Sequence, residues 1–137
     1  MFKSILVPVD MSDVEKGKAM IDIATQFAHQ GTKIKLISII ENIPTFIAAE
    51  LPSGIIDQKL NDVKEDLKAI ATASALKSVD SEVRSGSAAT GILAAADDWD
   101  ADLIIIGSHK PGLQDYFLGS TASRVVRHAK CSVLVSR

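Results

Sequence analysis

The chain has little of what several common protein classes require. Cys131 is the only cysteine among its 137 residues, which excludes a disulfide framework and a cysteine-based zinc site within one chain. The formal net charge of −2 provides no basic surface for nucleic acid or for an anionic membrane. No apolar run approaches the roughly 18 residues that span a bilayer, and the first such run is too short for a signal peptide. We therefore expect a cytoplasmic protein with no nucleic-acid partner and no membrane partner.

Aromatic residues are also scarce, at 4% of the chain, although hydrophobic residues make up 47%. The core must therefore consist mainly of Ile, Leu, Val and Ala, as in α/β proteins whose parallel strands are buried on both faces. A chain of this length fits one domain and buries about two thirds of its unfolded surface. We expect a single domain over residues 1–137.

Strand-like and helix-like patterns alternate along the chain. We expect strands over residues 4–9, 33–40, 81–85, 102–106 and 132–135, and helices over about 12–28, 54–77, 92–99 and 122–129. The first helix is predicted to start with a capping box of Ser12 and Glu15. Residues 41–53 are longer than a usual connection and are interpreted as a lid or a short extra turn. The βαβ alternation predicts a mainly parallel sheet with helices on both faces, which binds ligands beyond the carboxyl ends of its strands.

The most informative segment follows the strand that ends at Gly107. Gly107 permits close backbone approach, Lys110 supplies an ammonium group, and Gly119-Ser120-Thr121 supply N–H and hydroxyl donors at a helix start. Such an arrangement can bind phosphate, because the first N–H groups of a helix favour an anion. Taken as spacing alone, an ordinary loop between a strand and a helix explains the segment equally well. Neither the G-x-x-x-x-G-K-[ST] pattern nor the G-x-G-x-x-G pattern is present.

Two other side chains are candidates for ligand contact. Asp10 directly follows a buried strand and is predicted to accept hydrogen bonds from a ribose or an adenine edge. His109 is interpreted as a ligand contact rather than a catalytic group, because nothing near it in the sequence resembles an orienting partner or a nucleophile. The aspartates between residues 97 and 102 lack the spacing of a calcium loop and are interpreted as a solvated turn. No catalytic residue and no metal ligand is assigned.

Three stretches together resemble one family over essentially the whole chain. They are ILVPVD at 5–10, LIIIGSHKPGLQDYFLGSTASRVVRHA at 103–129 and CSVLVSR at 131–137. The chain resembles the universal stress protein family, and the SHKP and YFLGS wording is similar to its F/G-type branch. The resemblance implies an open five-stranded parallel sheet of order 3-2-1-4-5, with helices on both faces, in a Rossmann-like, adenine nucleotide α-hydrolase-like fold. It also implies binding of ATP or another adenine nucleotide.

Family members that hold nucleotide carry the motif G-x2-G-x9-G-[S/T], and this chain departs from it. Gly107 matches the first glycine and Gly119-Ser120 the final pair, but Lys110 stands at the second glycine and the last interval is one residue short. A side chain there either blocks the approach of phosphate or replaces the lost contacts with its ammonium group. We favour the second interpretation.

The resemblance also implies which residues line the site. The adenosine is expected to contact Pro8, Val9, Asp10, Ile39 and Ile40. The phosphates, with any Mg²⁺ held mainly by the phosphates themselves, are expected to contact Gly107, His109, Lys110, Gly119, Ser120 and Thr121.

The main functional hypothesis is a homodimeric regulator of a stress response, paired through the last strand at 132–135. We expect little or slow hydrolysis, because no Walker lysine, kinase-like loop or base for an attacking water is evident. The alternative is a nucleotide-free dimeric interaction module that uses the segment from Ile43 to Ile56. A slow phosphotransferase that labels its own Ser120 or Thr121 ranks last.

Overall fold

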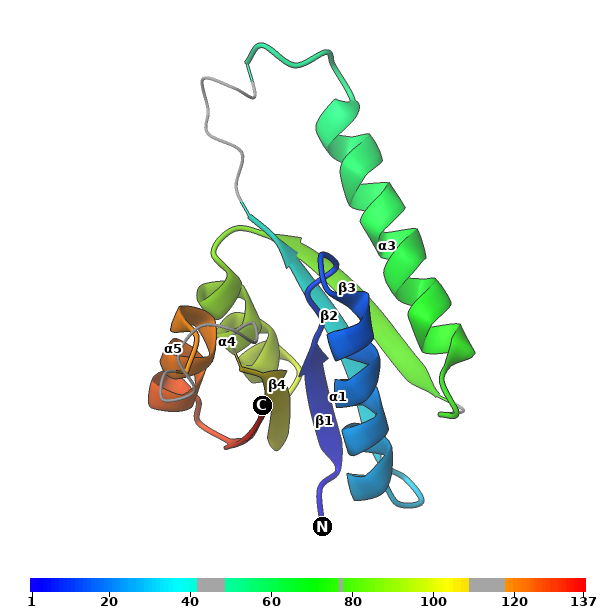
Figure 1. Ribbon diagram of the computed structural model, residues 1–137, viewed down its shortest axis with the longest axis vertical. Coiled ribbons are helices and arrows are strands. Elements are labelled where there is room, and N and C mark those ends of the chain that lie inside the picture. The colour runs from blue at the N-terminus through cyan, green and yellow to red at the C-terminus, as the bar shows by residue number, and fades with distance from the viewer. Residues whose placement is uncertain (42–48, 77, 109–117) are drawn as a thin grey trace.

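The computed structural model describes residues 1–41, 49–76, 78–108 and 118–137, and its strands form one parallel sheet (Figure 1). In chain order the elements are β1 (Ser4–Pro8), α1 (Val14–Phe27), β2 (Lys33–Ile40), α3 (Ile55–Ala73), β3 (Val79–Ser85), α4 (Ala88–Asp98), β4 (Leu103–Gly107), α5 (Ser120–His128) and β5 (Ser132–Ser136). The strand order is β3-β2-β1-β4-β5. This confirms the predicted fold class, sheet direction and strand order.

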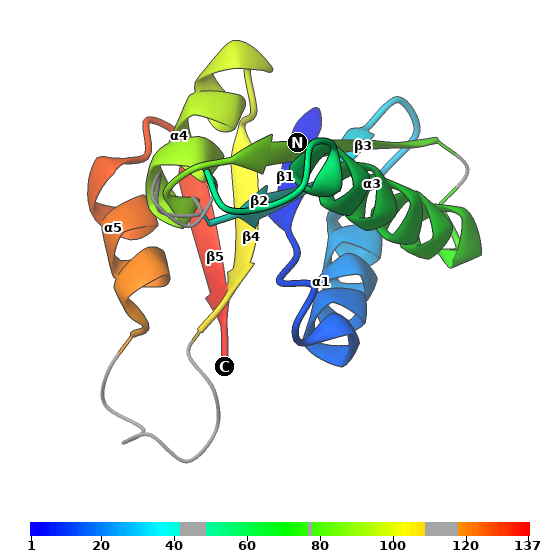
Figure 2. The same ribbon diagram turned by 90° about the horizontal axis from the view of Figure 1, so that it is seen from above.

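The helices cover the sheet from both sides, α1 and α3 on one face and α4 and α5 on the other (Figure 2). Each face has its own aliphatic core. The two cores meet at β1 and β4, whose central residues are buried on both faces; the fully buried residues include Ile5, Leu6, Val7, Ile104 and Ile105. As the composition indicated, the cores consist mainly of aliphatic side chains.

The start of α1 differs from the prediction. Asp13, not Ser12, is the N-cap, and its Oδ1 accepts the N–H of Lys16 at 3.3 Å. The N–H and the hydroxyl group of Ser12 instead both donate to Oδ1 of Asp10, at 2.9 and 2.7 Å. The capping box was wrong because the helix begins one residue later than expected, so that Asp13 is the residue whose side chain accepts the first-turn N–H.

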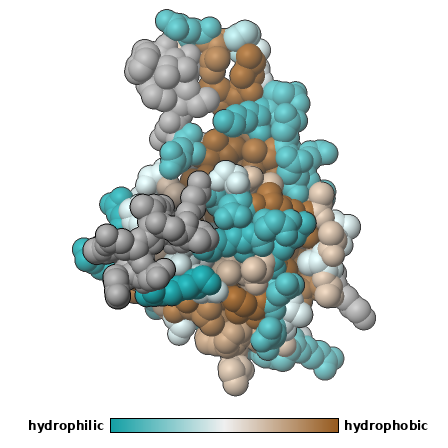
Figure 3. Space-filling model, viewed as in Figure 1, coloured by the Kyte–Doolittle hydropathy of each residue, from teal (hydrophilic) through white to brown (hydrophobic). Residues whose placement is uncertain are grey.

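Other boundaries shift by a few residues. α3 ends at Ala73 instead of continuing to residue 77, β3 starts at Val79, and α5 starts two residues early at Ser120. Residues 42–48, the larger part of the predicted lid or extra turn, lie outside the described residues. The first residues of α3 carry exposed apolar groups at Ile55 and Ile56, and Figure 3 shows apolar surface at that end of the molecule. None of the helices in the described part of the chain is long and apolar enough to cross a bilayer.

Of the aspartates between residues 97 and 102, Asp97, Asp98 and Asp100 are exposed, as a solvated turn requires, whereas Asp102 is half-buried. Asp102 accepts the backbone N–H groups of Lys3 at 2.7 Å and Ser4 at 3.0 Å, which ties the start of β1 to β4. Asp98 accepts a hydrogen bond from Arg84 at 3.1 Å. Across the described ranges, no group of three His, Cys, Asp or Glu side chains is arranged to hold a metal ion.

Candidate functional site

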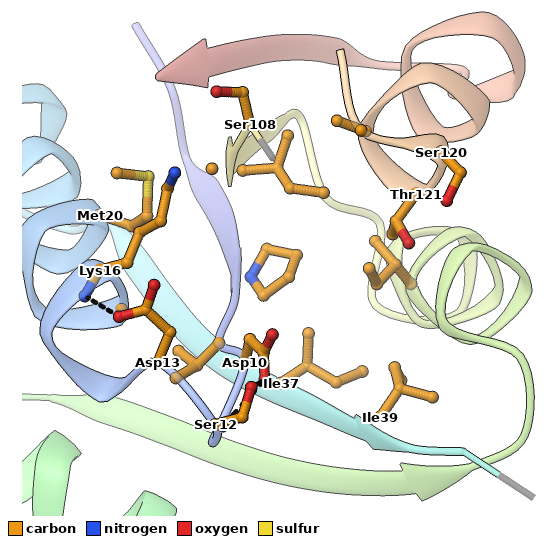
Figure 4. A pocket seen from close by; sticks show the side chains of 18 of the residues that line it. Asp10, Ser12, Asp13, Lys16, Met20, Ile37, Ile39, Ser108, Ser120 and Thr121 are labelled. Atoms are coloured by element: carbon orange, nitrogen blue, oxygen red, sulfur yellow. Dashed lines mark hydrogen bonds between the residues drawn. The ribbon is translucent and has the colours of Figure 1, made fainter. Parts of the chain in front are cut away.

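A cleft of about 490 Å³ opens at the carboxyl ends of β1 and β4, between α1 and α5 (Figure 4). It lies at the point where the sheet order reverses, with β2 on one side of β1 and β4 on the other. Parallel sheets commonly bind ligands at this position. Eight predicted site residues line the cleft: Pro8, Val9, Asp10, Ile39, Gly107, Gly119, Ser120 and Thr121.

The other three predicted site residues are placed differently. Ile40 is not among the described residues that line the cleft, and its carbonyl accepts the N–H of Gly86 at 2.8 Å, on the side of β3. Neighbouring residues of a strand point to opposite faces, so that only Ile39 of this pair faces the cleft and α4. His109 and Lys110 lie outside the described residues.

Asp10 is held at the mouth of the cleft by the turn that follows β1. Two donors from Ser12 bind the same carboxylate oxygen, and the N–H of Asp13 donates to the Asp10 carbonyl at 2.9 Å. The side chain is exposed, and no described group donates a hydrogen bond to its Oδ2. An oriented carboxylate of this kind can accept hydrogen bonds from ligand hydroxyl groups.

The opposite wall is the N-terminus of α5. Its N-cap is Gly119, and no side-chain hydrogen bond caps this end of the helix among the described residues. The first turn of the helix, from Ser120 to Ala122, lines the cleft. Since the first N–H groups of a helix have no intrahelical acceptor, they provide donors and a partial positive charge for an anionic ligand.

The end of β4 offers fewer free donors than the glycine segment suggested. The N–H of Ser108 donates to the carbonyl of Ser136 at 2.7 Å, so that pairing with β5 continues one residue past Gly107. The space beside Gly107 is occupied as well: a methyl group at Gly107 would lie 2.7 Å from Cε of Lys16. The space left by the missing side chain is filled by a lysine from α1.

Lys16 is a charged residue of the cleft that the sequence analysis did not predict. A signal for it exists, because Asp13, Lys16, Gly17 and Met20 follow the i, i+3, i+4, i+7 spacing of one helix face, and all four line the cleft. A lysine on the inward face of an amphipathic helix is unusual. Lys16 is the only cationic side chain among the described residues of the cleft, whereas Asp10, Asp13 and Glu41 bring carboxylates.

Comparison with known proteins places the chain among relatives along its full length. The family model described as "Universal stress protein family" matches residues 1–137. The universal stress protein MJ0531 of Methanocaldococcus jannaschii is 32% identical over 140 residues, which cover 98% of this chain and 82% of that protein. Universal stress protein G of Salmonella typhimurium is 30% identical over 142 residues, covering 100% of both chains. The family resemblance is confirmed, and the similarity to the G protein fits the F/G-type branch.

Solved structures share the fold. Hypothetical protein MJ0577 superposes with a TM-score of 0.81 at 25% identity, covering 98% of this chain and 95% of that one. A universal stress protein in complex with cAMP has a TM-score of 0.71 at 19% identity, with 99% and 97% covered. The Archaeoglobus fulgidus universal stress protein in complex with dAMP has a TM-score of 0.65 at 18% identity, with 98% of each chain covered.

Proposed function

The chain belongs to the universal stress protein family, and we propose that its cleft binds an adenine nucleotide whose occupancy regulates a stress response. The observation that carries the proposal is the pairing of two walls across one cleft: the oriented carboxylate of Asp10 and the uncapped start of α5 at Ser120. A nucleotide presents hydroxyl groups to the first and phosphates to the second.

The adenosine part of the ligand is assigned to the β1 and β2 side of the cleft. Pro8, Val9 and Ile39 line this side and provide an apolar surface for a flat base, while Asp10 provides the acceptor for the ribose. The cavity volume of about 490 Å³ falls within the roughly 300–1,000 Å³ of small-molecule sites. Proteins of the same fold that hold cAMP and dAMP support an adenine ligand.

The phosphate part is assigned to the side of Gly107 and α5. Gly119, Ser120 and Thr121 line it, and His109 and Lys110 remain predicted contacts. Any Mg²⁺ would be held mainly by the phosphates. Slow hydrolysis is expected, because the described lining residues include no histidine or cysteine and the sequence has no Walker lysine or kinase-like catalytic loop. A preparation free of contaminating ATPase that turned over many times per second would refute this part.

We propose that the protein regulates the stress response as a homodimer, in which two copies pair through residues 132–135. β5 is an edge strand whose only described strand partner is β4, and its Val133, Leu134 and Val135 are half-buried in the single chain. An apolar edge of this kind is suited to strand pairing with a second copy. Nucleotide at the end of β4 would lie one strand away from that edge.

A second candidate function is the nucleotide-free dimeric interaction module. It is favoured by two features at the end of β4: the Ser108 N–H is bound to Ser136, and the Lys16 side chain fills the space beside Gly107. Both features leave less backbone accessible to phosphate than the glycine motif of the family implies.

The test starts with freshly purified protein to which no nucleotide has been added. The protein is denatured, and mass spectrometry identifies any released nucleotide; stoichiometric AMP, ADP or ATP is the expected result. Binding is then measured by calorimetry for Asp10→Asn and Ser120→Ala, with Asp22→Asn as a matched control, since Asp22 is an exposed carboxylate of α1 outside the cleft. Loss of binding in the first two variants alone supports the proposal. An empty extract together with unmeasurable affinity for added nucleotide selects the interaction module.

A further inference from the structure

We propose that Lys16 is the residue that makes the cleft selective for phosphorylated nucleotides. We propose also that Gly107, which has no side chain, leaves the space in which the Lys16 side chain lies. The inference rests on the proposed function, because it assigns the phosphate contact within the same cleft. It concerns a residue on α1, away from the glycine segment in which phosphate contacts were predicted.

The position of Lys16 is set by the way α1 begins. Asp13 caps the helix by accepting the Lys16 N–H, which fixes the backbone of Lys16 in the first turn. The next residue, Gly17, lets the helix lie directly on the residue that follows β1: a methyl group at Gly17 would be 2.6 Å from Cγ1 of Val9. The helix is therefore so close to the sheet that the side chain of residue 16 reaches the neighbouring strand β4.

The stem of Lys16 crosses the end of β4 at Gly107. A methyl group at Gly107 would lie 2.7 Å from Cε, 3.3 Å from Cδ and 3.5 Å from Cγ of the lysine. Three consecutive methylene groups thus run along the glycine, and the residue as a whole is half-buried. Lysine stems commonly pack in this way along the atoms of neighbouring residues.

The charges of the cleft are arranged unevenly. Lys16 lies on the α1 side and Ser120 and Thr121 on the α5 side, with the cleft between them (Figure 4). A phosphate group in this space is attracted by the Lys16 ammonium group from one wall, which also carries the Asp13 carboxylate, and by the helix N-terminus from the other. Adenosine carries no phosphate and gains neither interaction. Lys16 is therefore expected to separate ligands by phosphate content rather than by base.

The first experiment compares adenosine, AMP and ATP by calorimetry on the wild type and on Lys16→Met, which keeps a long apolar side chain and removes the charge. Affinity for AMP and ATP is expected to fall by about tenfold, with adenosine unchanged, because charged hydrogen bonds contribute more than neutral ones. The affinity for ATP should also depend less on salt. Lys18→Met is the matched control, since Lys18 lies on the same helix outside the cleft, with a side chain that is 53% exposed.

A double-mutant cycle tests whether Gly107 leaves room for the Lys16 side chain. Gly107→Ala is expected to fold, because the nearest atoms that its methyl group meets all belong to the flexible side chain of Lys16, and to weaken ATP binding by displacing the ammonium group. In the Lys16→Ala background the same change should have no further effect, since the stem that it displaces is absent. An equal loss of ATP affinity in both backgrounds would show that Gly107 approaches the ligand itself. It would refute the proposal that Gly107 leaves room for Lys16.

The outcomes separate this inference from the function on which it rests. A wild type that binds none of the three ligands refutes both. A wild type that binds them, with Lys16→Met retaining the same ratio of ATP to adenosine affinity, refutes the role of Lys16 alone. If Lys16→Met shows no cooperative thermal unfolding, Lys16→Gln replaces it in the same comparison.

Discussion

The two edge strands of the sheet are built from opposite kinds of residues. On β3, Glu82 accepts hydrogen bonds from Arg84 and from Lys35 of the neighbouring strand, and Arg84 also binds Asp98 of α4. The ammonium group of Lys35 lies 5.1 Å from the centre of the Trp99 ring. On β5, the central residues are Val133, Leu134 and Val135.

This difference indicates which edge a second copy of the chain can pair with. Strand addition at β3 would have to desolvate a network of charges, which is costly unless each is paired again. Addition at β5 would instead cover half-buried aliphatic side chains and gain hydrophobic free energy. The comparison supports β5 as the strand that pairs in the proposed dimer, and β3 as the edge strand that does not pair with a second copy.

The largest expected effect comes from breaking the apolar edge. Leu134→Glu places a carboxylate where the partner strand is proposed to pack, and we expect the dimer to weaken by at least about a hundredfold, because an unpaired charge would be desolvated. Size-exclusion chromatography with light scattering over a concentration series measures the change. Leu134→Ala, which loses packing without adding charge, should remain dimeric. Equal masses for the two variants would contradict the assignment.

A smaller effect is expected at the charged edge. Burial alone would raise the pKa of Glu82, but hydrogen bonds and charges from Arg84 and Lys35 outweigh it, so that the pKa lies below the ordinary 4.5. A carboxyl group with a lowered pKa stabilises the fold above its unfolded pKa and loses this contribution as the pH falls through the folded value. Glu82→Gln should therefore lower the free energy of unfolding by about 1 kcal/mol at pH 7, and the difference should shrink below pH 4.5.

Urea unfolding at pH 7 and at pH 3 measures this dependence. Glu15→Gln is the control, because Glu15 forms an ion pair with Lys18 at 3.3 Å while its side chain is 86% exposed. We expect no measurable change from that pair. A Glu82→Gln effect that is the same at both pH values would mean that the β3 network does not stabilise the fold through charge.

The smallest effect concerns Cys131, which directly precedes β5. Burial raises the pKa of this thiol, and the charges of Asp102 and Asp97 raise it further. Since only the thiolate is nucleophilic, alkylation by iodoacetamide at neutral pH should be several-fold slower than for free cysteine and should accelerate as the pH rises through 9.0 and beyond. Leu134→Glu should show the same pH dependence; a shift to the value of free cysteine would mean that the variant loosens β5 itself.

The sequence predicted the elements well because their periodicity is local. The apolar runs of β1 and β4 and the amphipathic pattern of α3 each identify an element without reference to the rest of the chain. The strand order could not be predicted in this way. Alternation predicts a parallel sheet, and only the family resemblance supplied the order 3-2-1-4-5, which the structure has.

The lining of the cleft was predicted in part for the same reason. Asp10 and Ser120 are found by their places at a strand end and a helix start, which local patterns reveal. Lys16 depends on how closely α1 lies on the sheet, which is set by the contact between Gly17 and Val9. The Ser12 cap failed because the helix starts one residue later, where the Asp13 carboxylate accepts the Lys16 N–H. Such tertiary and competing contacts cannot be read from spacing.

The hydrogen bonds from Lys3 and Ser4 to Asp102 join residues 99 and 98 positions apart in the chain. The middle strand β1 lies between β2 and β4, so its second neighbour can pair with it only after β4 has been synthesised. During synthesis on the ribosome, about three quarters of the chain must emerge before this strand can be enclosed on both sides. Until then one of its hydrogen-bonding edges is open to other nascent chains, a period in which a chaperone would have the most to protect.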